Sequence, residues 1–242
     1  MTNQSIRSND PAYTTDEYHE EYYQSVLRNR TYLSHKLRLR IMDETFQPRP
    51  GEKIIDLGCG AGLAAEFLSS RGAIVHGVDL SDIAVRTAKQ HCAQFNHKDA
   101  TFEIGDASNL PHLADASFDK ALSADVTEHC GYDTMLAIFR EAFRLLKPGG
   151  TYFIYTPNPL HWIELFKKWG ILKQEPTHTG LRTAPLIIEA LKKVGFEVVA
   201  HPKPASMLPV VSWFEKLWSL LPIFPNLGIY RVVLLAKKPA GS

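Results

Sequence analysis

The sequence predicts an α/β fold built on a mostly parallel sheet. From Lys53 onward, short runs rich in β-branched residues alternate with helical patterns, and the first run leads directly into a glycine-rich turn. Strands that alternate with helices are typical of βαβ units, in which the strands lie parallel. Seven strands are expected, at Lys53–Leu57, Ile74–Leu80, Thr101–Gly105, Lys120–Ala124, Thr151–Thr156, Glu197–His201 and Tyr230–Lys237.

Capping signals and apolar periodicity place the helices between these strands. Thr14 and Glu17 form a capping box that opens the first helical region. Ser81 is the expected N-cap of a later helix, and Gly195 the residue that ends the last one. The helical segments expected are 12–47, Leu63–Leu68, Asp82–Cys92, Tyr132–Leu146 and Ala184–Val194.

Length and composition indicate a single domain over residues 1–242 with a core of ordinary size. Apolar residues make up 45% of the chain, and a net charge of +1 gives no overall field that would favour nucleic acid or anionic lipid. Residues 1–11 are expected to be disordered, and no signal peptide or run of about 18 apolar residues is present, so a cytoplasmic location is predicted. Free thiols are expected at Cys59, Cys92 and Cys130.

The segment Ile54–Gly62 is a buried strand that runs into a glycine turn and then a helix. Gly58, Gly60 and Gly62 allow the backbone positive φ angles and a close approach to a ligand. The helix that follows offers free N–H groups and partial positive charge at its N-terminus. This arrangement favours a bound cofactor, although a glycine turn alone is a weak signal.

Two acids follow the next two strands. Asp79 lies 21 residues after Gly58, where a carboxylate can accept both hydroxyls of a ribose. Asp106, followed by Ala107, ends the third strand and can accept from an exocyclic amine. Each acid alone is equally well explained as a turn or helix-cap residue, but the two in order after a glycine turn favour a nucleoside site.

The set IIDLGCGAG, GVDL, GDA, FDKALSAD and LLKPGG resembles the class I S-adenosylmethionine (SAM) dependent methyltransferases over Lys53–Thr156. The resemblance implies the strand order 3-2-1-4-5-7-6, an antiparallel last strand and helices on both faces of a Rossmann-like sheet. It implies SAM as cofactor, with the methionine part near Asp56 and the glycine turn, the ribose at Asp79 and the adenine at Asp106. The cofactor-binding residues it implies are Asp56, Gly58, Cys59, Gly60, Gly62, Asp79, Leu80, Asp106, Ala107 and Asp125.

The alternatives to this cofactor are NAD(P) in the same fold, or SAM bound without catalysis. The GxGxG spacing and the LKPGG turn argue against NAD(P). A non-catalytic SAM-binding protein stays open on the sequence alone.

The segment Asp125–His129 supplies candidate catalytic groups after the fourth strand. An oxygen acceptor must lose its proton to a general base or to a metal ion that lowers its pKa. The segment resembles the ExxEH motif of the ubiquinone-biosynthesis O-methyltransferases, which implies a divalent cation such as Mg²⁺ beside the acceptor, and a similar segment occurs in small-RNA 3′-end methyltransferases. The metal ligands it implies are Asp125, Glu128, His129 and, from a later segment, His178.

The alternative is a site without a metal. His129, with an ordinary pKa of about 6.5, would accept the proton, and Glu128 would be a second catalytic group or part of the pocket wall. Asp125 is one methylene shorter than the glutamate of the motif, which weakens its case as a ligand.

Two inserts, 157–182 and 202–228, hold all four tryptophans and many other aromatic residues. They are expected to form an aromatic lid over a small apolar acceptor, or else to complete the core. Within the second insert, Trp213–Phe224 also has the composition of a segment that lies on a membrane surface.

The helical region 12–47 is expected to cover the cofactor with its tyrosines. Lys36, Arg38 and Arg40 alternate with leucines there and are interpreted as the solvated side of a helix rather than a track for RNA. The tyrosines expected over the cofactor are Tyr18, Tyr22, Tyr23 and Tyr32.

The sequence as a whole predicts methyl transfer from SAM to a small, apolar or aromatic hydroxylated molecule, with O-methylation favoured. Methylation of RNA ribose and SAM binding without catalysis are the alternatives. The sequence contains no signal for the acceptor's identity.

Overall fold

The computed structural model describes residues 20–29, 33–173, 178–204, 212–213 and 228–241. The predicted capping box at Thr14 and Glu17, the first 11 residues, Tyr18, Tyr32 and most of the 202–228 insert lie outside the described residues. Trp213 is the described part of the Trp213–Phe224 segment, and it is exposed.

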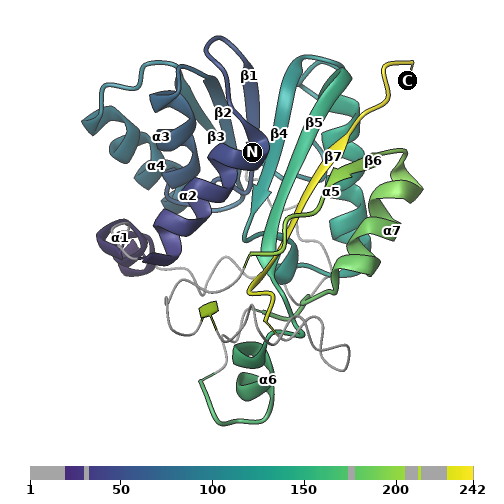
Figure 1. The fold of residues 1–242 in the computed structure, drawn as a ribbon. Helices are drawn as coiled ribbons and strands as arrows, with labels where there is room; N and C mark the ends of the chain where they lie inside the picture. The colour runs from purple at the N-terminus through teal and green to yellow at the C-terminus, as the bar shows by residue number, and fades with distance from the viewer. Residues whose placement is uncertain (1–19, 30–32, 174–177, 205–211, 214–227, 242) are drawn as a thin grey trace, which may run out of the picture.

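Seven strands form one sheet in the order β3-β2-β1-β4-β5-β7-β6, which confirms the predicted order (Figure 1). Strands β1 to β5 pair in parallel, and β7 is antiparallel to both β5 and β6, as predicted. The strands are β1 (Lys53–Leu57), β2 (Ile74–Asp79), β3 (Ala100–Ile104), β4 (Phe118–Ala124), β5 (Leu146–Pro157), β6 (Glu197–Ala200) and β7 (Arg231–Lys237).

The helices agree with the expected segments except for α6 and the short η3, which the sequence did not predict. Ser81 caps α4 as expected, because its Oγ accepts from the N–H of Ala84 at 3.2 Å. Gly195 ends α7 with φ 113°, the left-handed conformation that glycine adopts readily. The helices are α1 (Glu20–Arg28), α2 (Leu33–Phe46), α3 (Leu63–Ser70), α4 (Asp82–Gln94), η3 (Thr127–His129), α5 (Tyr132–Leu145), α6 (Trp162–Lys168) and α7 (Ala184–Val194).

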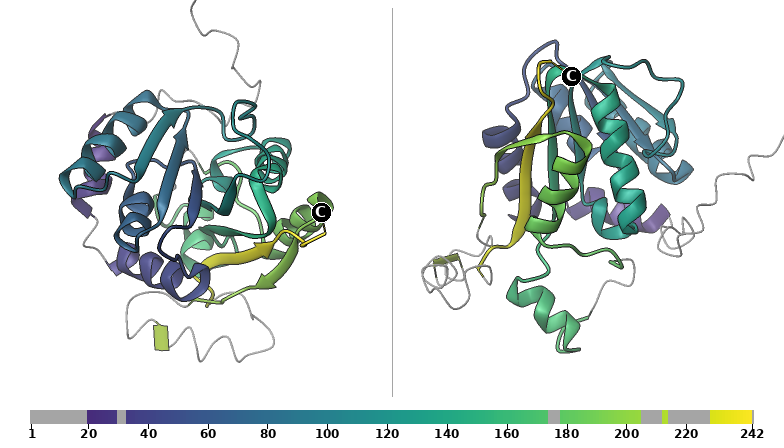
Figure 2. Two further views of the ribbon diagram at one scale, coloured as in Figure 1. Left: turned by 90° about the horizontal axis from the view of Figure 1, so that it is seen from above. Right: turned by 90° about the vertical axis from the view of Figure 1, so that its right-hand side faces the viewer.

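Alternate residues of the central strands face opposite sides of the sheet and build two apolar cores. Phe153 and Val233 belong to the core shared with α2, α3 and α4. Their neighbours Ile154 and Leu234 belong to the core shared with α5 and α7. Helices therefore cover both faces, as predicted (Figure 2).

Strand β5 begins earlier than predicted. The Lys147–Gly150 segment was expected to end a helix, but β5 already starts at Leu146, directly after α5. Leu146 pairs with Phe118 of β4, and a register shift follows before Lys120 pairs with Thr151. Gly149 and Gly150 thus lie in the irregular first part of β5.

The strand order reverses between β1 and β4, and ligands of open α/β sheets bind outside the carboxyl ends of strands at such a point. In Figure 1 these ends lie at the bottom of the sheet, together with α1 and α6. None of the helices in the described parts of the chain is both long enough and apolar enough to cross a bilayer.

We predict that Ser81→Ala lowers the free energy of unfolding by about 1 kcal/mol, because α4 loses its N-cap acceptor. Chemical denaturation without cofactor measures the change. The control is Ser69→Ala on α3, whose Oγ has no hydrogen-bond partner among the described residues, and which should change stability by less than about 0.5 kcal/mol. Equal effects of the two substitutions would contradict the assigned cap.

Candidate active site

A cavity of about 270 Å³ lies at the carboxyl ends of β1, β2 and β4, the position expected for a cofactor. Residues from the turn after each of these strands line it, and α1 and α2 close one side. The lining residues described are Tyr22, Tyr23, Val26, Arg38, Asp56, Gly58, Cys59, Gly60, Ala61, Leu63, Ala64, Asp79, Leu80, Ser81, Ala124, Asp125, Val126 and His129.

The glycine turn after β1 approaches the cavity as its sequence predicted. Gly58 has φ 87° and Gly60 φ 51°, and a Cβ at Gly58 would collide with the side chain of Val126. Gly62 also has the expected positive φ, and it has a packing role as well. It caps α3 with φ 80°, and a Cβ there would lie 2.9 Å from that of Ala88, so this glycine permits α3 and α4 to pack closely.

Asp79 and Asp56 place two carboxyl groups on the cavity. Asp79 accepts from the N–H of Gly60 at 2.9 Å and of Ser81 at 3.0 Å, and burial raises its pKa. Asp56 is buried, and its Oδ2 has no hydrogen-bond partner among the described residues. Burial, and then the charge of Asp79, raises the pKa of Asp56 to about 7. An unpartnered buried carboxyl oxygen is a good acceptor for a cationic group of a ligand.

Asp106 and Ala107, which the resemblance places at the adenine, are not among the described residues that line the cavity. Asp106 Oδ1 accepts from the backbone N–H of Ser108 at 2.9 Å and from its hydroxyl at 2.7 Å. Ala107 is buried in the core on the α5 side of the sheet. Asp106 Oδ1 thus stabilises the turn after β3, and the expected contact with adenine stays a prediction.

Asp125 follows β4 with φ 56°, an uncommon backbone conformation for a residue other than glycine. Its Oδ2 accepts from Arg38 Nη1 at 2.8 Å, and its Oδ1 accepts from Arg231 Nη1 at 2.9 Å. Burial opposes its charged form, but Arg231 and then Arg38 outweigh burial and hold the pKa of Asp125 below its ordinary value. Two guanidinium groups thus occupy both oxygens of this carboxylate.

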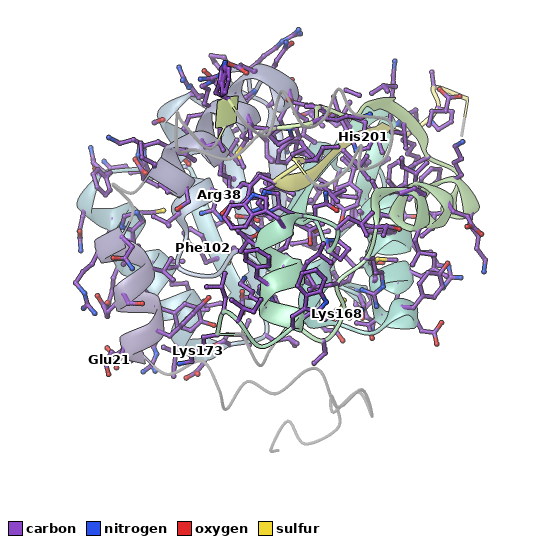
Figure 3. All side chains as sticks on the ribbon, turned by 60° about the horizontal axis from the view of Figure 1, so that its bottom comes forward. Glu21, Arg38, Phe102, Lys168, Lys173 and His201 are labelled. Atoms are coloured by element: carbon purple, nitrogen blue, oxygen red, sulfur yellow. The ribbon has the colours of Figure 1, made fainter. Side chains whose placement is uncertain are left out.

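The interpretation of Arg38 as a solvated residue is wrong. Its side chain is 18% exposed and lines the cavity, while that of Arg40 is 72% exposed. Figure 3 labels Arg38 on the face formed by the carboxyl ends of the strands. The alternation with leucines could not indicate the role of Arg38, because its partner Asp125 is distant in the sequence.

Glu128, His129 and His178 form a group whose ligand atoms lie within 4.8 Å of one another. Glu128 is buried, and its Oε2 accepts a hydrogen bond from Thr156 Oγ1 at 2.9 Å. Burial, followed by the negative charge of Asp125, raises the pKa of Glu128 to about 8. The ring centroids of His129 and His178 are 5.0 Å apart. Burial, followed by the charge of His129, lowers the pKa of His178 to about 4. Burial therefore favours the neutral forms of Glu128 and His178, and His129 is the member of the group that lines the cavity.

This group does not fit the Mg²⁺ ion that the resemblance implies. Mg²⁺ requires a nearly complete shell of oxygen ligands, whereas the group offers two imidazoles and one carboxyl group. Asp125, the expected additional oxygen ligand, lies outside the group because both of its oxygens bind arginines. Two imidazoles and a carboxylate are a set that transition-metal ions prefer.

Arg182 holds the loop that carries these residues, and the sequence analysis did not identify it. Its guanidinium donates to the carbonyls of Thr127 at 2.8 Å, Gly180 at 2.7 Å and Cys130 at 2.8 Å. The N–H of Gly180 donates to the carbonyl of Glu128 at 2.7 Å, and a Cβ at Gly180 would collide with the Cys130 carbonyl. These bonds bring the segment that contains His178 against η3.

The covering elements that the sequence predicted include the N-terminal helical cap and the 157–182 insert. Tyr22 and Tyr23 of α1 line the cavity, as expected for a cap over the cofactor. No residue of the 157–182 insert lines this cavity within the described part of the chain, and the expected lid over an acceptor stays a prediction. Trp162, Phe166 and Trp169 of that insert instead contact one another.

Solved structures with the same fold are methyltransferases and at least one cyclase. A SAM-dependent methyltransferase from Aquifex aeolicus is 15% identical with a TM-score of 0.64, covering 91% of this chain and 98% of its own. A Haemonchus contortus phosphoethanolamine N-methyltransferase 2 solved with SAM is 20% identical with a TM-score of 0.69, covering 92% of this chain and 58% of its own. The cyclase SpnF is 20% identical with a TM-score of 0.65, covering 86% of this chain and 82% of its own. These likenesses establish the Rossmann-like methyltransferase fold.

Residues 55–154 match the family model described as a methyltransferase domain. A 24-methylenesterol C-methyltransferase 2 from Arabidopsis thaliana is 33% identical over 205 residues, covering 76% of this chain and 53% of the relative. A ubiquinone biosynthesis O-methyltransferase from Thiobacillus denitrificans is 34% identical over 122 residues, covering 50% of this chain and 51% of the relative. Residues 55–154 are thus similar to a methyltransferase domain, and the chain spans about half the length of the curated relatives it matches.

We predict that Arg182→Ala lowers the free energy of unfolding by about 2 kcal/mol, because three buried carbonyls lose a charged donor. Denaturant titration measures the loss. The control is Arg86→Ala, which removes a 64% exposed side chain and an i,i+4 pair with Asp82, and should cost less than about 0.5 kcal/mol. A loss at Arg182 no larger than at Arg86 would show that the loop does not depend on these bonds.

Proposed function

We propose that this protein transfers a methyl group from SAM to a small, largely apolar hydroxylated molecule. The observation that carries the proposal is one cavity lined jointly by Asp56, Asp79 and His129, at the point where the strand order reverses. The methyltransferase domain match supports the reaction class.

The groups around the cavity match the charges of SAM. The unpartnered oxygen of Asp56 would accept from the methionine ammonium, and the Arg38 guanidinium would bind the carboxylate. Asp79 would accept from the ribose hydroxyls, and it lies beside the glycine turn, whose Gly60 N–H already donates to it. The side chains of Tyr22 and Tyr23 would cover the bound cofactor and exclude water from the reacting centre.

His129 is the proposed general base for the acceptor hydroxyl. Methyl transfer is an in-line displacement at the sulfonium, so the protein must position the two reactants and remove one proton. His129 lines the cavity, whereas Glu128 is not among the described lining residues, and burial raises its pKa to about 8. We therefore give Glu128 a positioning role in the loop instead of the catalytic role that the sequence indicated. No step is assigned to a metal ion.

The relatives support an apolar acceptor, because sterols and ubiquinone are both largely apolar molecules. They also provide a second candidate reaction. The sterol C-methyltransferases align with a larger share of this chain than the ubiquinone O-methyltransferases do, which favours carbon methylation as the alternative. In that reaction His129 would remove a proton from the methylated carbon skeleton.

The test is transfer of a ¹³C-methyl group from SAM into a protein-free lipid and small-molecule extract and, separately, into total RNA, each with and without EDTA. Label in the extract that resists EDTA is expected, and the ¹³C NMR shift separates oxygen from carbon acceptors. Label found only in RNA, or no label while SAM binds, would overturn the proposed acceptor class. Activity lost in EDTA and restored by Mn²⁺ or Fe²⁺ would assign a metal to Glu128, His129 and His178.

We predict that SAM affinity rises with pH up to about pH 7, by as much as tenfold per unit. The neutral Asp56 must lose its proton to bind an ammonium group, and its pKa of about 7 sets where the rise ends. Isothermal titration calorimetry from pH 5.5 to 8.5 measures the slope. Asp56→Asn should bind SAM more weakly and without this pH dependence, whereas the control Asp106→Asn should keep the pH dependence. A pH dependence that persists in Asp56→Asn would assign the titration to another group.

We predict that His129→Ala lowers kcat by about 10²- to 10⁴-fold, the usual contribution of a general base, and retains SAM binding. The control His112→Ala removes a 54% exposed histidine that pairs with Glu103, and should leave kcat unchanged. Steady-state kinetics with the acceptor from the labelling experiment measure both. An unchanged kcat in His129→Ala would remove this residue from the chemistry.

A further inference from the structure

Helix α6 projects from the carboxyl edge of the sheet, away from the two helical layers (Figures 1 and 2). None of its residues is buried, although it contains Trp162, Ile163, Leu165 and Phe166. A helix of this composition ordinarily packs into a core, so its exposure requires an explanation.

The chain stays exposed from Lys168 to Lys173, a segment we name the α6 tip. Within these six residues the exposed fraction is 64% for Trp169, 63% for Ile171 and 42% for Leu172. Single exposed apolar residues are common, but three large ones in four positions form a patch of the kind that marks an interaction site.

The charge of the α6 tip favours an anionic partner. Lys168 and Lys173 flank the apolar residues, and the tip contains no acidic residue. The neighbouring Lys167 differs, because it binds Glu164 within α6 at 2.8 Å. Tryptophan and lysine side by side are typical of chains at a membrane interface, where the ring enters the headgroup layer and the ammonium meets lipid phosphate.

A chain of aromatic contacts holds the tip to the sheet. Trp169 contacts Phe166, which contacts Trp162, with centroid distances of 6.0 and 5.6 Å. Trp162 contacts His161, which is buried and contacts Tyr230 beside β7, both at 5.3 Å. The tip is therefore presented at a defined position instead of on a free loop.

The tip and the candidate active site share one face of the molecule. Figure 1 shows α6 beyond the carboxyl ends of the strands, the edge at which the cavity lies, and Figure 3 labels Lys168, Lys173 and Arg38 in a view that brings this edge forward. After the tip, the chain returns at Gly180 to the carbonyl of Glu128. Contact of this face with a bilayer would bring the site close to an apolar acceptor dissolved in it, an advantage that rests on the proposed function.

We propose that the α6 tip docks the protein onto the surface of a bilayer that contains anionic lipids. Trp169, Ile171 and Leu172 insert at the headgroup level, and Lys168 and Lys173 bind the lipid phosphates. The contact is peripheral and weakens as ionic strength rises.

The test is flotation of the full chain with vesicles of phosphatidylcholine alone or with one third phosphatidylglycerol. Binding to the anionic vesicles is expected, with at least a tenfold loss in Trp169→Glu and loss of the anionic preference in the double variant Lys168→Glu/Lys173→Glu. The matched controls are Val199→Glu, at a 52% exposed residue of β6, and Lys192→Glu/Lys193→Glu on α7, which should bind like wild type.

Wild-type protein that does not float with anionic vesicles, or Trp169→Glu that floats as well as wild type, would overturn the docking. Analytical sedimentation without lipid tests whether the tip instead binds a second copy of the chain. A dimer that dissociates in Trp169→Glu would make the tip an interface between two copies and would overturn the docking. Calorimetric SAM binding, measured on the same variants, separates the two proposals. Vesicle binding without SAM binding would overturn only the proposed function, and SAM binding without vesicle binding only the docking.

Discussion

The ion-pair bridge centred on Asp125 is the interaction on which the candidate site depends. It joins three elements that are far apart in the chain, because Arg38 lies 87 residues before Asp125 and Arg231 lies 106 residues after it. Asp125 has a positive φ, a conformation that costs free energy unless its surroundings hold it. Two charged hydrogen bonds hold it here, and through Arg38 they also fix the position of α2 on the cavity.

The same bridge explains why two acids three residues apart have opposite pKa shifts. Burial opposes ionisation of both, but the arginines outweigh it at Asp125 and lower that pKa. Glu128 receives no comparable compensation, and the charge on Asp125 adds to the effect of burial, which raises the pKa of Glu128 to about 8. One acid is therefore charged and structural, and the other is neutral. His129, beside them, is the residue of this segment's Glu128–His129 pair that lines the cavity.

Local sequence patterns predicted the sheet, most helices and the glycine turn, because these depend on neighbouring residues. Resemblance supplied the strand order. The roles of Arg38, Arg231 and Arg182 could not be predicted, because each depends on a partner more than 50 residues away. At Asp106 the sequence places an acid at a strand end but does not show that Ser108 donates to its Oδ1. Periodicity also misled at Arg38, where a residue on the polar side of a helix turned out to face the cavity.

The exposure of the α6 tip follows from the topology. Helices α2 to α4 cover one face of the sheet and α5 with α7 cover the other, so both cores are complete without α6. A segment inserted after β5 must leave the sheet at its carboxyl edge, and among the described residues neither core cluster includes a residue of α6. Its aromatic residues can contact one another and His161, but Trp169, Ile171 and Leu172 at its far end face solvent. Composition gives the amount of apolar surface in the insert, and only the fold determines which way the surface of the α6 tip faces.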